Sequence, residues 1–155
     1  MQITGLNRGV IATCLLGILL STYALYVEMA AEMKPGYKAL CDISEHASCS
    51  KVLTSKYGKG LGIIPKDSPF KLPNCVYGIM FYCIMIFLTT FNVTSVVKVQ
   101  IGLSITSLAT CVYLAYLLIF VLRDFCVVCV STYLLNIIIA ILLNKKHNGL
   151  LTKNR

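Results

Sequence analysis

Four long apolar runs divide the chain, covering residues 10–28, 75–93, 99–122 and 125–143. A bilayer core of about 30 Å needs roughly 20 apolar residues in a helix that rises about 1.5 Å per residue. Within each run the apolar residues are continuous rather than alternating, which excludes a β-barrel. The pattern therefore predicts an all-α membrane protein with four transmembrane helices.

The connections between the last three runs are short: residues 94–98 join the second to the third, and Arg123-Asp124 joins the third to the fourth. Such short connections force neighbouring helices to be antiparallel, which predicts an up-down four-helix bundle. We expect residues 1–155 to form one domain. Both termini then share one side of the membrane, and the long loop 31–74 lies on the other side together with the Arg123-Asp124 turn.

The first run has an alternative interpretation as a secretory signal peptide. Arg8 precedes it, and the small residues Ala30 and Ala31 follow it. Signal peptides have apolar regions of about 7–15 residues, however, and end in a small-residue cleavage site. This run is longer and has no good cleavage site, so we predict that it is retained as a membrane anchor.

Residues 31–74 form the only extended polar segment, and they contain Cys41 and Cys49 among several glycines and prolines. Ser48 could cap a short helix over residues 49–56, which Gly58 would end. The apolar residues 61–64 are expected to dip into the membrane interface or onto the mouth of the bundle.

The composition supports a membrane protein, and it argues against a soluble protein and against a nucleic-acid-binding protein. The chain is 57% hydrophobic, with a mean hydropathy of +0.80 and 13% charged residues, whereas soluble proteins are about 45–50% apolar and about 25% charged. The formal charge of +8 could suggest nucleic-acid binding. The basic residues lie between and beyond the apolar runs, however, where they meet anionic lipid headgroups, and no nucleic-acid-binding motif accompanies them.

The strongest chemical signal is the C-x-x-C pair Cys126 and Cys129, at the start of the last apolar run. At helical spacing these cysteines share one face with Tyr133 and Asn136. A helix N-terminus favours the thiolate, the reactive form of cysteine. Two alternatives stay open: structural core cysteines, or half of a zinc site, for which His46, Cys41 and Cys49 are the other candidate ligands. We favour a redox pair and predict no metal.

Cys41 and Cys49 form a second pair, in the polar loop. They could make a structural disulfide, or they could relay electrons to the buried pair by thiol–disulfide exchange. Basic residues are shared too evenly between the two sides to set the orientation by charge. A cysteine pair favours an oxidising compartment for the loop, and this places both termini in the cytosol.

Other polar and sulfur-bearing residues lie in or beside the apolar runs. Asn74 and Tyr133 are the polar residues nearest the buried pair, and could bind a carbonyl-bearing ligand or bond neighbouring helices. The remaining cysteines are interpreted as small apolar residues that fill space between helices, and this interpretation is weakest for Cys75. The charged residues at the ends of the spans are interpreted as membrane anchors. The fillers are Cys14, Cys75, Cys83 and Cys111, and the anchors are Glu28, Arg123 and Asp124.

Taken in order along the chain, these features resemble the vitamin K epoxide reductase family, and most closely its single-domain animal members. The resemblance covers nearly the whole chain. The matching motifs are Ala39-Leu40-Cys41-Asp42 with Cys49-Ser50, Ser55-Lys56-Tyr57-Gly58-Lys59-Gly60-Leu61-Gly62, Asn74 with Gly78 and Phe81-Tyr82, Val112-Tyr113-Leu114-Ala115-Tyr116, and residues 125–136.

The resemblance implies a role for each matching position. Cys41 would receive electrons from a thioredoxin-like partner in the lumen of the endoplasmic reticulum, and Cys49 would pass them to Cys126. Cys129 would attack the substrate, and Cys126 would resolve the adduct. The loop would close over the pocket as a cap. Asn74 and Tyr133 would hydrogen-bond the two ends of the naphthoquinone headgroup, and Phe81 and Tyr82 would line the pocket, with Ser55 and Asp42 in supporting positions.

The implied activity is the thiol-dependent reduction of vitamin K 2,3-epoxide to the quinone and of the quinone to the hydroquinone. No bound cofactor is expected, and anticoagulant-type inhibitors that mimic the quinone are implied as ligands. Tyr57 and Tyr77 depart from the family pattern, which has Trp and Phe at these positions. Two alternatives remain: a disulfide-generating oxidase that passes electrons to a quinone, and a four-span scaffold protein.

Overall fold

The computed structural model describes residues 3–65 and 67–153, and within these residues helices form the whole framework, with no β-strand. This confirms the predicted all-α class. The helical segments in chain order are α1 (Ile3–Met33), α2 (Cys49–Leu53), the 3₁₀ turn η1 (Gly60–Gly62), α3 (Asn74–Thr89), α4 (Thr94–Tyr116) with its π-helical continuation η2 (Leu117–Leu122), and α5 (Val127–Lys153).

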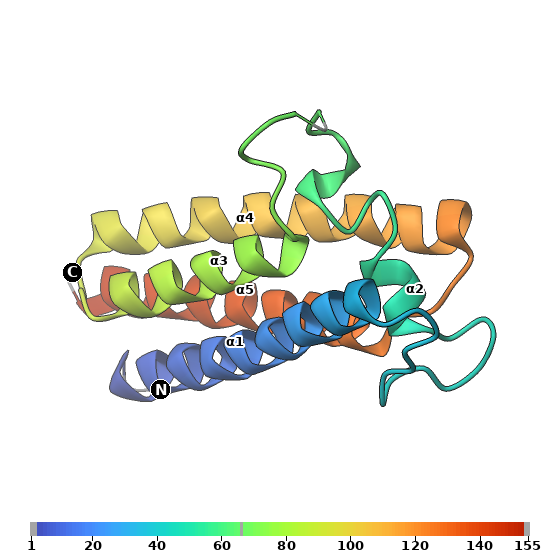
Figure 1. Cartoon of the computed structure of the whole chain (residues 1–155). Coiled ribbons are helices and arrows are strands. Elements are labelled where there is room, and N and C mark those ends of the chain that lie inside the picture. The colour runs from blue at the N-terminus through green and yellow to red at the C-terminus, as the bar shows by residue number, and fades with distance from the viewer. Residues whose placement is uncertain (1–2, 66, 154–155) are drawn as a thin grey trace.

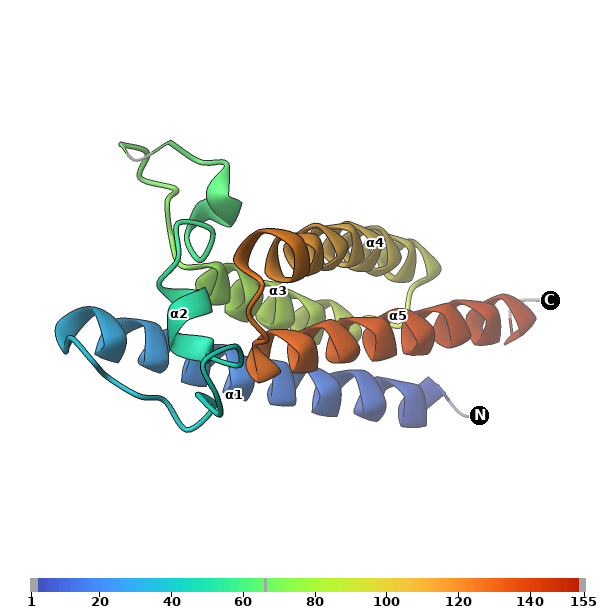
Figure 2. The same ribbon diagram turned by 90° about the vertical axis from the view of Figure 1, so that its right-hand side faces the viewer.

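The helices α1, α3, α4 and α5 lie side by side, and consecutive members run in opposite directions (Figures 1 and 2). Helix α1 packs mainly against α3 and α5, and α4 packs mainly against α5. The start of α1, the α3–α4 connection and the end of α5 lie at one end of the molecule. Helix α2 and the long loop lie at the opposite end, beside the connection between α4 and α5 (Figure 2).

Three of these helices are long and apolar enough to cross a membrane: Ile3–Met33, Thr94–Leu122 and Val127–Lys153. Helix α3 is apolar but has only 16 residues. The sequence-based boundary of residues 75–93 for a second helix is therefore wrong at its C-terminal side, because the helix ends at Thr89.

Where helix α3 ends, neighbouring helices supply hydrogen-bond donors to carbonyl groups of its last turn. Gln100 Nε2 on α4 donates to Met85 O at 3.2 Å, and Lys146 Nζ on α5 donates to Thr89 O at 3.4 Å. The C-terminal carbonyls of a helix have no partner within the helix, and in lipid they must find one elsewhere. A basic side chain also interacts favourably with this end of the helix dipole.

Other helix boundaries also differ from the sequence-based ones. Helix α5 continues beyond the predicted end at residue 143 to Lys153, and Lys146 and Leu150 are buried against the other helices. Helix α2 is shorter than the predicted residues 49–56. Its predicted cap is confirmed, since the Ser48 side chain accepts a hydrogen bond from Lys51 N.

The buried side chains form two clusters, one toward each end of the helices. The cluster near the loop joins Cys49, Cys126 and Val128 to residues of α1, and the other cluster contains Tyr82 and Ile139. Many large apolar side chains remain exposed on the outer faces of α1, α4 and α5. Such an extensive apolar exterior suits contact with lipid rather than water.

Candidate active site

A cavity of about 380 Å³ lies between the helices at the end that carries the loop, a volume within the usual range for small-ligand sites. Side chains from α1, α3, α4 and α5 line it, together with residues of α2 and the segment that follows α2. The lining is mostly apolar, with a few polar groups, among them Ser55, Asn74, Cys129, Tyr133 and Asn136.

The two cysteines of the C-x-x-C motif occupy different environments at the start of α5. Cys126 precedes the first helical residue and is fully buried, and its Sγ accepts a hydrogen bond from Cys129 N at 3.3 Å. Cys126 thus caps the helix N-terminus, where backbone N–H groups favour a negatively charged sulfur. Cys129 lines the cavity, and the two Sγ atoms are 2.7 Å apart.

Cys41 and Cys49 form a disulfide in the loop, with their Cα atoms 5.7 Å apart. Cys49 is fully buried in the same apolar cluster as Cys126. A backbone hydrogen bond of 2.9 Å from Phe125 N to His46 O fastens the loop to the segment just before the C-x-x-C motif. The structure therefore brings the two cysteine pairs together, and the disulfide removes two of the candidate zinc ligands.

Asp42 does not line the cavity but organises the loop around the disulfide. Its carboxylate accepts hydrogen bonds from the backbone amides of Ala39 and Ser50 and from the hydroxyl groups of Ser48 and Ser50. Partial burial acts to raise the pKa of Asp42, but these four hydrogen bonds outweigh it and lower the pKa to about 2.

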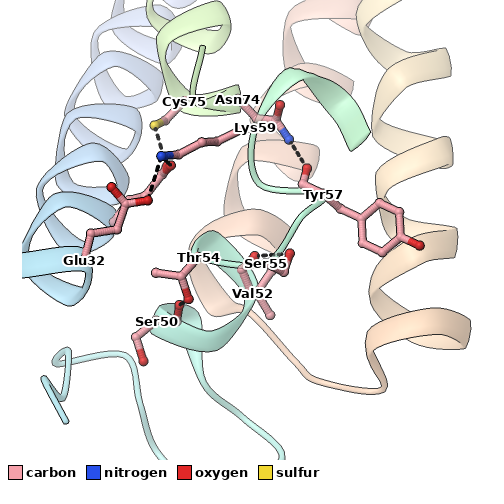
Figure 3. Close-up of polar contacts among 10 residues, drawn as sticks. Glu32, Ser50, Val52, Thr54, Ser55, Tyr57, Lys59, Asn74 and Cys75 are labelled. Atoms are coloured by element: carbon pink, nitrogen blue, oxygen red, sulfur yellow. Dashed lines mark hydrogen bonds and ion pairs between the residues drawn. The ribbon is translucent and has the colours of Figure 1, made fainter. Parts of the chain in front are cut away.

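Asn74, the first residue of α3, lines the cavity while its side chain is bonded to the loop. Asn74 Nδ2 donates to Tyr57 O at 2.6 Å (Figure 3). Asn74 Oδ1 accepts from Leu61 N at 2.9 Å. Leu61 has a left-handed backbone with φ of 57°, and its carbonyl oxygen also accepts from the Tyr113 hydroxyl at 3.2 Å. Asn74 therefore holds the segment between Tyr57 and Leu61 against the cavity.

The other predicted binding residues, Tyr133, Phe81, Tyr82 and Ser55, also line the cavity. Phe81 and Tyr82 pack edge to face, with ring centroids 5.3 Å apart. The hydroxyl group of Ser55 donates to Val52 O at 2.7 Å. Among residues 3–65 and 67–153, the Tyr133 hydroxyl has no hydrogen-bond partner, so it is free to bind a ligand.

A polar cluster beside the cavity was not anticipated from the sequence. The interpretation of Glu28 as an anchor at a span end is wrong: Glu28 is 1% exposed, and its carboxylate accepts from Cys75 Sγ at 3.7 Å. Lys59 Nζ lies 3.8 Å from Glu28 and 2.6 Å from Glu32 (Figure 3). The hydrogen bond to Glu32 raises the pKa of Lys59. The sequence did contain one sign of this cluster, because Glu28 is an acidic residue included in the apolar run over residues 10–28.

Two cysteines interpreted as fillers also line the cavity, Cys75 from α3 and Cys111 from α4. Cys111 Sγ accepts a hydrogen bond from Asn136 Nδ2 at 3.2 Å. The sequence could not distinguish these two cysteines from Cys14, which is buried in the opposite apolar cluster, because all three lie in apolar helices.

The chain is similar to known proteins over most of its length. The family model described as "Vitamin K epoxide reductase family" matches residues 9–143. Vitamin K epoxide reductase complex subunit 1 of Rattus norvegicus is 40% identical over 130 residues, which cover 81% of each chain. The protein of the same name from Mus musculus is 38% identical over 131 residues, covering 82% of this chain and 81% of the mouse protein. The chain therefore belongs to the vitamin K epoxide reductase family and is an oxidoreductase of that family.

Proposed function

We propose that this protein reduces vitamin K 2,3-epoxide to vitamin K quinone, and the quinone to the hydroquinone, with cysteine thiols as the reductant. The observation that carries the proposal is the position of Cys129. Cys129 lines an apolar cavity, and its sulfur is 2.7 Å from that of Cys126. Such a cavity suits an apolar ring with a few polar atoms, and the adjacent thiol supplies the second electron-donating sulfur.

For the epoxide, the Cys129 thiolate attacks a carbon of the strained ring, and the C–O bond breaks. The departing oxygen takes up a proton and becomes a hydroxyl group. Cys126 then attacks the Cys129 sulfur, so that the C–S bond breaks and its electron pair expels the hydroxyl group, which leaves as water after a second protonation. The balance is one epoxide and two thiols converted to one quinone, one water and one disulfide.

In the same proposal the Cys126–Cys129 disulfide is reduced again through the loop pair. Once Cys41 and Cys49 have been reduced by a soluble thioredoxin-like dithiol, the Cys49 thiolate attacks Cys126 and passes on two electrons by disulfide exchange. The shared apolar cluster of Cys49 and Cys126 supports this order, as does the hydrogen bond from Phe125 N to His46 O. Tyr133, Phe81, Tyr82, Asn74 and Ser55 would surround the ring.

The proposed setting is the membrane of the endoplasmic reticulum, crossed four times by the single domain. The loop over residues 31–74 would form a luminal cap, and both termini would be cytosolic. Helix α3 would cross together with the four apolar and polar residues that follow it, because lipid can thin around a short span. Glycosylation of the sequon at Asn92 would contradict this orientation, since that residue would then be luminal.

An epoxide-reduction assay in detergent tests the activity, with dithiothreitol as the reductant. We expect Cys126→Ala and Cys129→Ala to abolish turnover, because each removes one sulfur of the reacting pair. Cys41→Ala should retain part of the activity, since a small dithiol can bypass the loop pair. Cys83→Ala is the matched control, an exposed cysteine outside the cavity lining. Full activity in Cys129→Ala would refute the proposed function.

A further inference from the structure

The carboxylate of Glu28, near the C-terminal end of α1, has no part in the reaction proposed above. Glu28 is 1% exposed. Its Oε2 accepts a hydrogen bond from Cys75 Sγ at 3.7 Å, and its Oε1, 3.8 Å from Lys59 Nζ, has no hydrogen-bond partner within residues 3–65 and 67–153. A buried carboxylate destabilises a fold unless it is paired and fully hydrogen-bonded. The free oxygen of Glu28 therefore indicates a role other than packing.

Glu28 belongs to a row of ionisable side chains that connects the surface with the cavity. On the outer side, Lys59 Nζ is 2.6 Å from Glu32 Oε1, and the side chains of Lys59 and Glu32 are 33% and 47% exposed. On the inner side, Cys75 lines the cavity. Lys59 lies between Glu32 and Cys75 (Figure 3). The buried acid thus contacts a solvent-exposed group on one side and a cavity-lining thiol on the other.

The proposed reaction needs such a connection, because disulfide exchange carries electrons but no protons. Thiolates attack and thiolates leave, so each exchange with the loop pair leaves Cys126 and Cys129 as two thiolates. Reduction of one epoxide to the quinone and water consumes two electrons and two protons. The cavity lining is mostly apolar, and unpaired charge in such surroundings is costly. Protons must therefore enter the cavity for every turnover.

We propose that Glu28 passes protons from the solution at the loop end of the molecule into the cavity, through the Cys75 thiol. This proposal rests on the proposed function and adds the proton supply to it. Protonated Glu28 donates its proton to Cys75 Sγ, while the Cys75 S–H releases its own proton on the cavity side, since a thiol both accepts and donates. The Glu28 carboxylate then takes a new proton from the solution beside Lys59. Two such transfers match the two electrons that the thiolates give up, and both protons leave in the product water.

A proton relay through Glu28 has a defined pH dependence. The ionisable groups that face Glu28 are Glu32 on its own helix, Lys59 from the loop and Cys75 from α3. Glu28 can donate only while it is protonated, so kcat should fall as the pH rises through the range in which this carboxyl ionises. Lys59→Met removes the cation that favours the ionised form, so the alkaline fall in kcat should move to higher pH. A Glu28 with a purely structural role would leave the position of this fall unchanged.

Cys75 provides a matched pair of variants, because Cys75→Ser keeps a group that accepts and donates a proton and Cys75→Ala does not. The measurement is epoxide reduction with dithiothreitol, with each variant compared with wild type at the same pH. Cys75→Ala and Glu28→Gln should lower kcat roughly tenfold to hundredfold, toward the lower end of the about 10²–10⁴-fold that general acid–base catalysis contributes. Cys75→Ser should keep most of the wild-type kcat.

Cys83→Ala is the control, because Cys83 is an exposed cysteine of the same helix outside the cavity lining, and it should keep the wild-type kcat. Thermal unfolding shows whether each variant is folded, and if Glu28→Gln or Cys75→Ala is not, the pH profile of Lys59→Met decides. Equal kcat in Cys75→Ala and Cys75→Ser, or an alkaline fall that does not move in Lys59→Met, would overturn the inference. A wild type that reduces no epoxide would instead refute the proposed function, on which this inference rests.

Discussion

The carboxylate of Asp42 accepts hydrogen bonds from both the backbone amide and the hydroxyl group of Ser50, at 3.0 and 2.7 Å. Asp42 follows Cys41 and Ser50 follows Cys49, so these two bonds join the chain on either side of the disulfide. The loop conformation around the cysteine pair therefore depends on a carboxylate as well as on the covalent bond.

The Asp42→Asn variant should be less stable than wild type at pH 6, because an amide cannot accept all of these hydrogen bonds. We expect a loss of about 1–2 kcal/mol, the usual contribution of hydrogen bonds to a charged group with a reduction for partial exposure. Thermal unfolding in detergent measures it. Asp67→Asn, which changes an exposed carboxyl of the same loop, is the control and should unfold like wild type.

The Asp42 contribution should also depend on pH in a defined direction. The folded-state pKa of about 2 lies below the unfolded value of about 3.9. The stabilisation is therefore fully present above about pH 4 and is lost as the pH falls toward 2. The unfolding temperatures of wild type and Asp42→Asn should converge over this range. A difference between them that stays constant from pH 6 to pH 2 would contradict this assignment.

The local features of the site were predictable from residue spacing, whereas contacts between residues far apart in the sequence were not. The shared helix face of Cys129, Tyr133 and Asn136 follows from residues three and four apart, and all three residues line the cavity. The ion pair of Glu28 with Lys59 joins residues far apart in the sequence. It depends on how α1 is rotated and where the loop returns, which no local pattern specifies.

The end of α3 was unpredictable for the same reason. Beyond Leu88 the polar residues Thr89, Thr90 and Asn92 alternate with Phe91 and Val93, so hydropathy does not mark one residue at which the helix stops. The stop coincides with donors from Gln100 and Lys146, on two other helices. Local hydrophobicity thus predicted that a helix forms here, whereas the residue at which it ends coincides with contacts from other helices.

The role of Asn74 in holding the loop can be tested by hydrogen exchange. Asn74→Ala removes both bonds to the loop, so the amide of Leu61 should exchange faster and the left-handed backbone of Leu61 should relax. Asn74→Asp keeps the acceptor for Leu61 N but loses the donor to Tyr57 O, so the Leu61 amide should remain protected. Equal exchange of this amide in wild type and in both variants would exclude the loop-holding role.

Tyr82 packs closely on Gly17 of α1, so the methyl group added by Gly17→Ala should destabilise the fold. A Cβ atom at Gly17 would lie 2.7 Å from Tyr82 Cε1, and Tyr82 lines the cavity. Gly17→Ala should therefore displace the ring, lower stability by about 1–3 kcal/mol and raise the KM for the epoxide.

Gly102→Ala, in α4, is the control for this prediction, because no atom lies within 4 Å of its added Cβ. Both substitutions gain the same helix propensity, of about 1 kcal/mol. The difference between their unfolding temperatures in detergent therefore reports the collision with Tyr82. Equal stabilisation of the two variants would show that the ring moves aside without cost.

The ion pair of Glu28 and Lys59 predicts that the effect of substituting one residue on stability depends on whether the other is present. Lys59→Met leaves the buried Glu28 carboxylate without its cation, and we expect a loss of about 1–2 kcal/mol, reduced because one third of the Lys59 side chain is exposed. Glu28→Gln in the Lys59→Met background removes the buried charge and should restore most of the loss. Glu32→Gln alone should cost less, since the Glu32 side chain is about half exposed whereas that of Glu28 is buried. Thermal unfolding in detergent of wild type, Glu28→Gln, Lys59→Met and the double variant gives the coupling energy between Glu28 and Lys59. Additive effects of Glu28→Gln and Lys59→Met would mean that this pair does not stabilise the contact between the loop and α1.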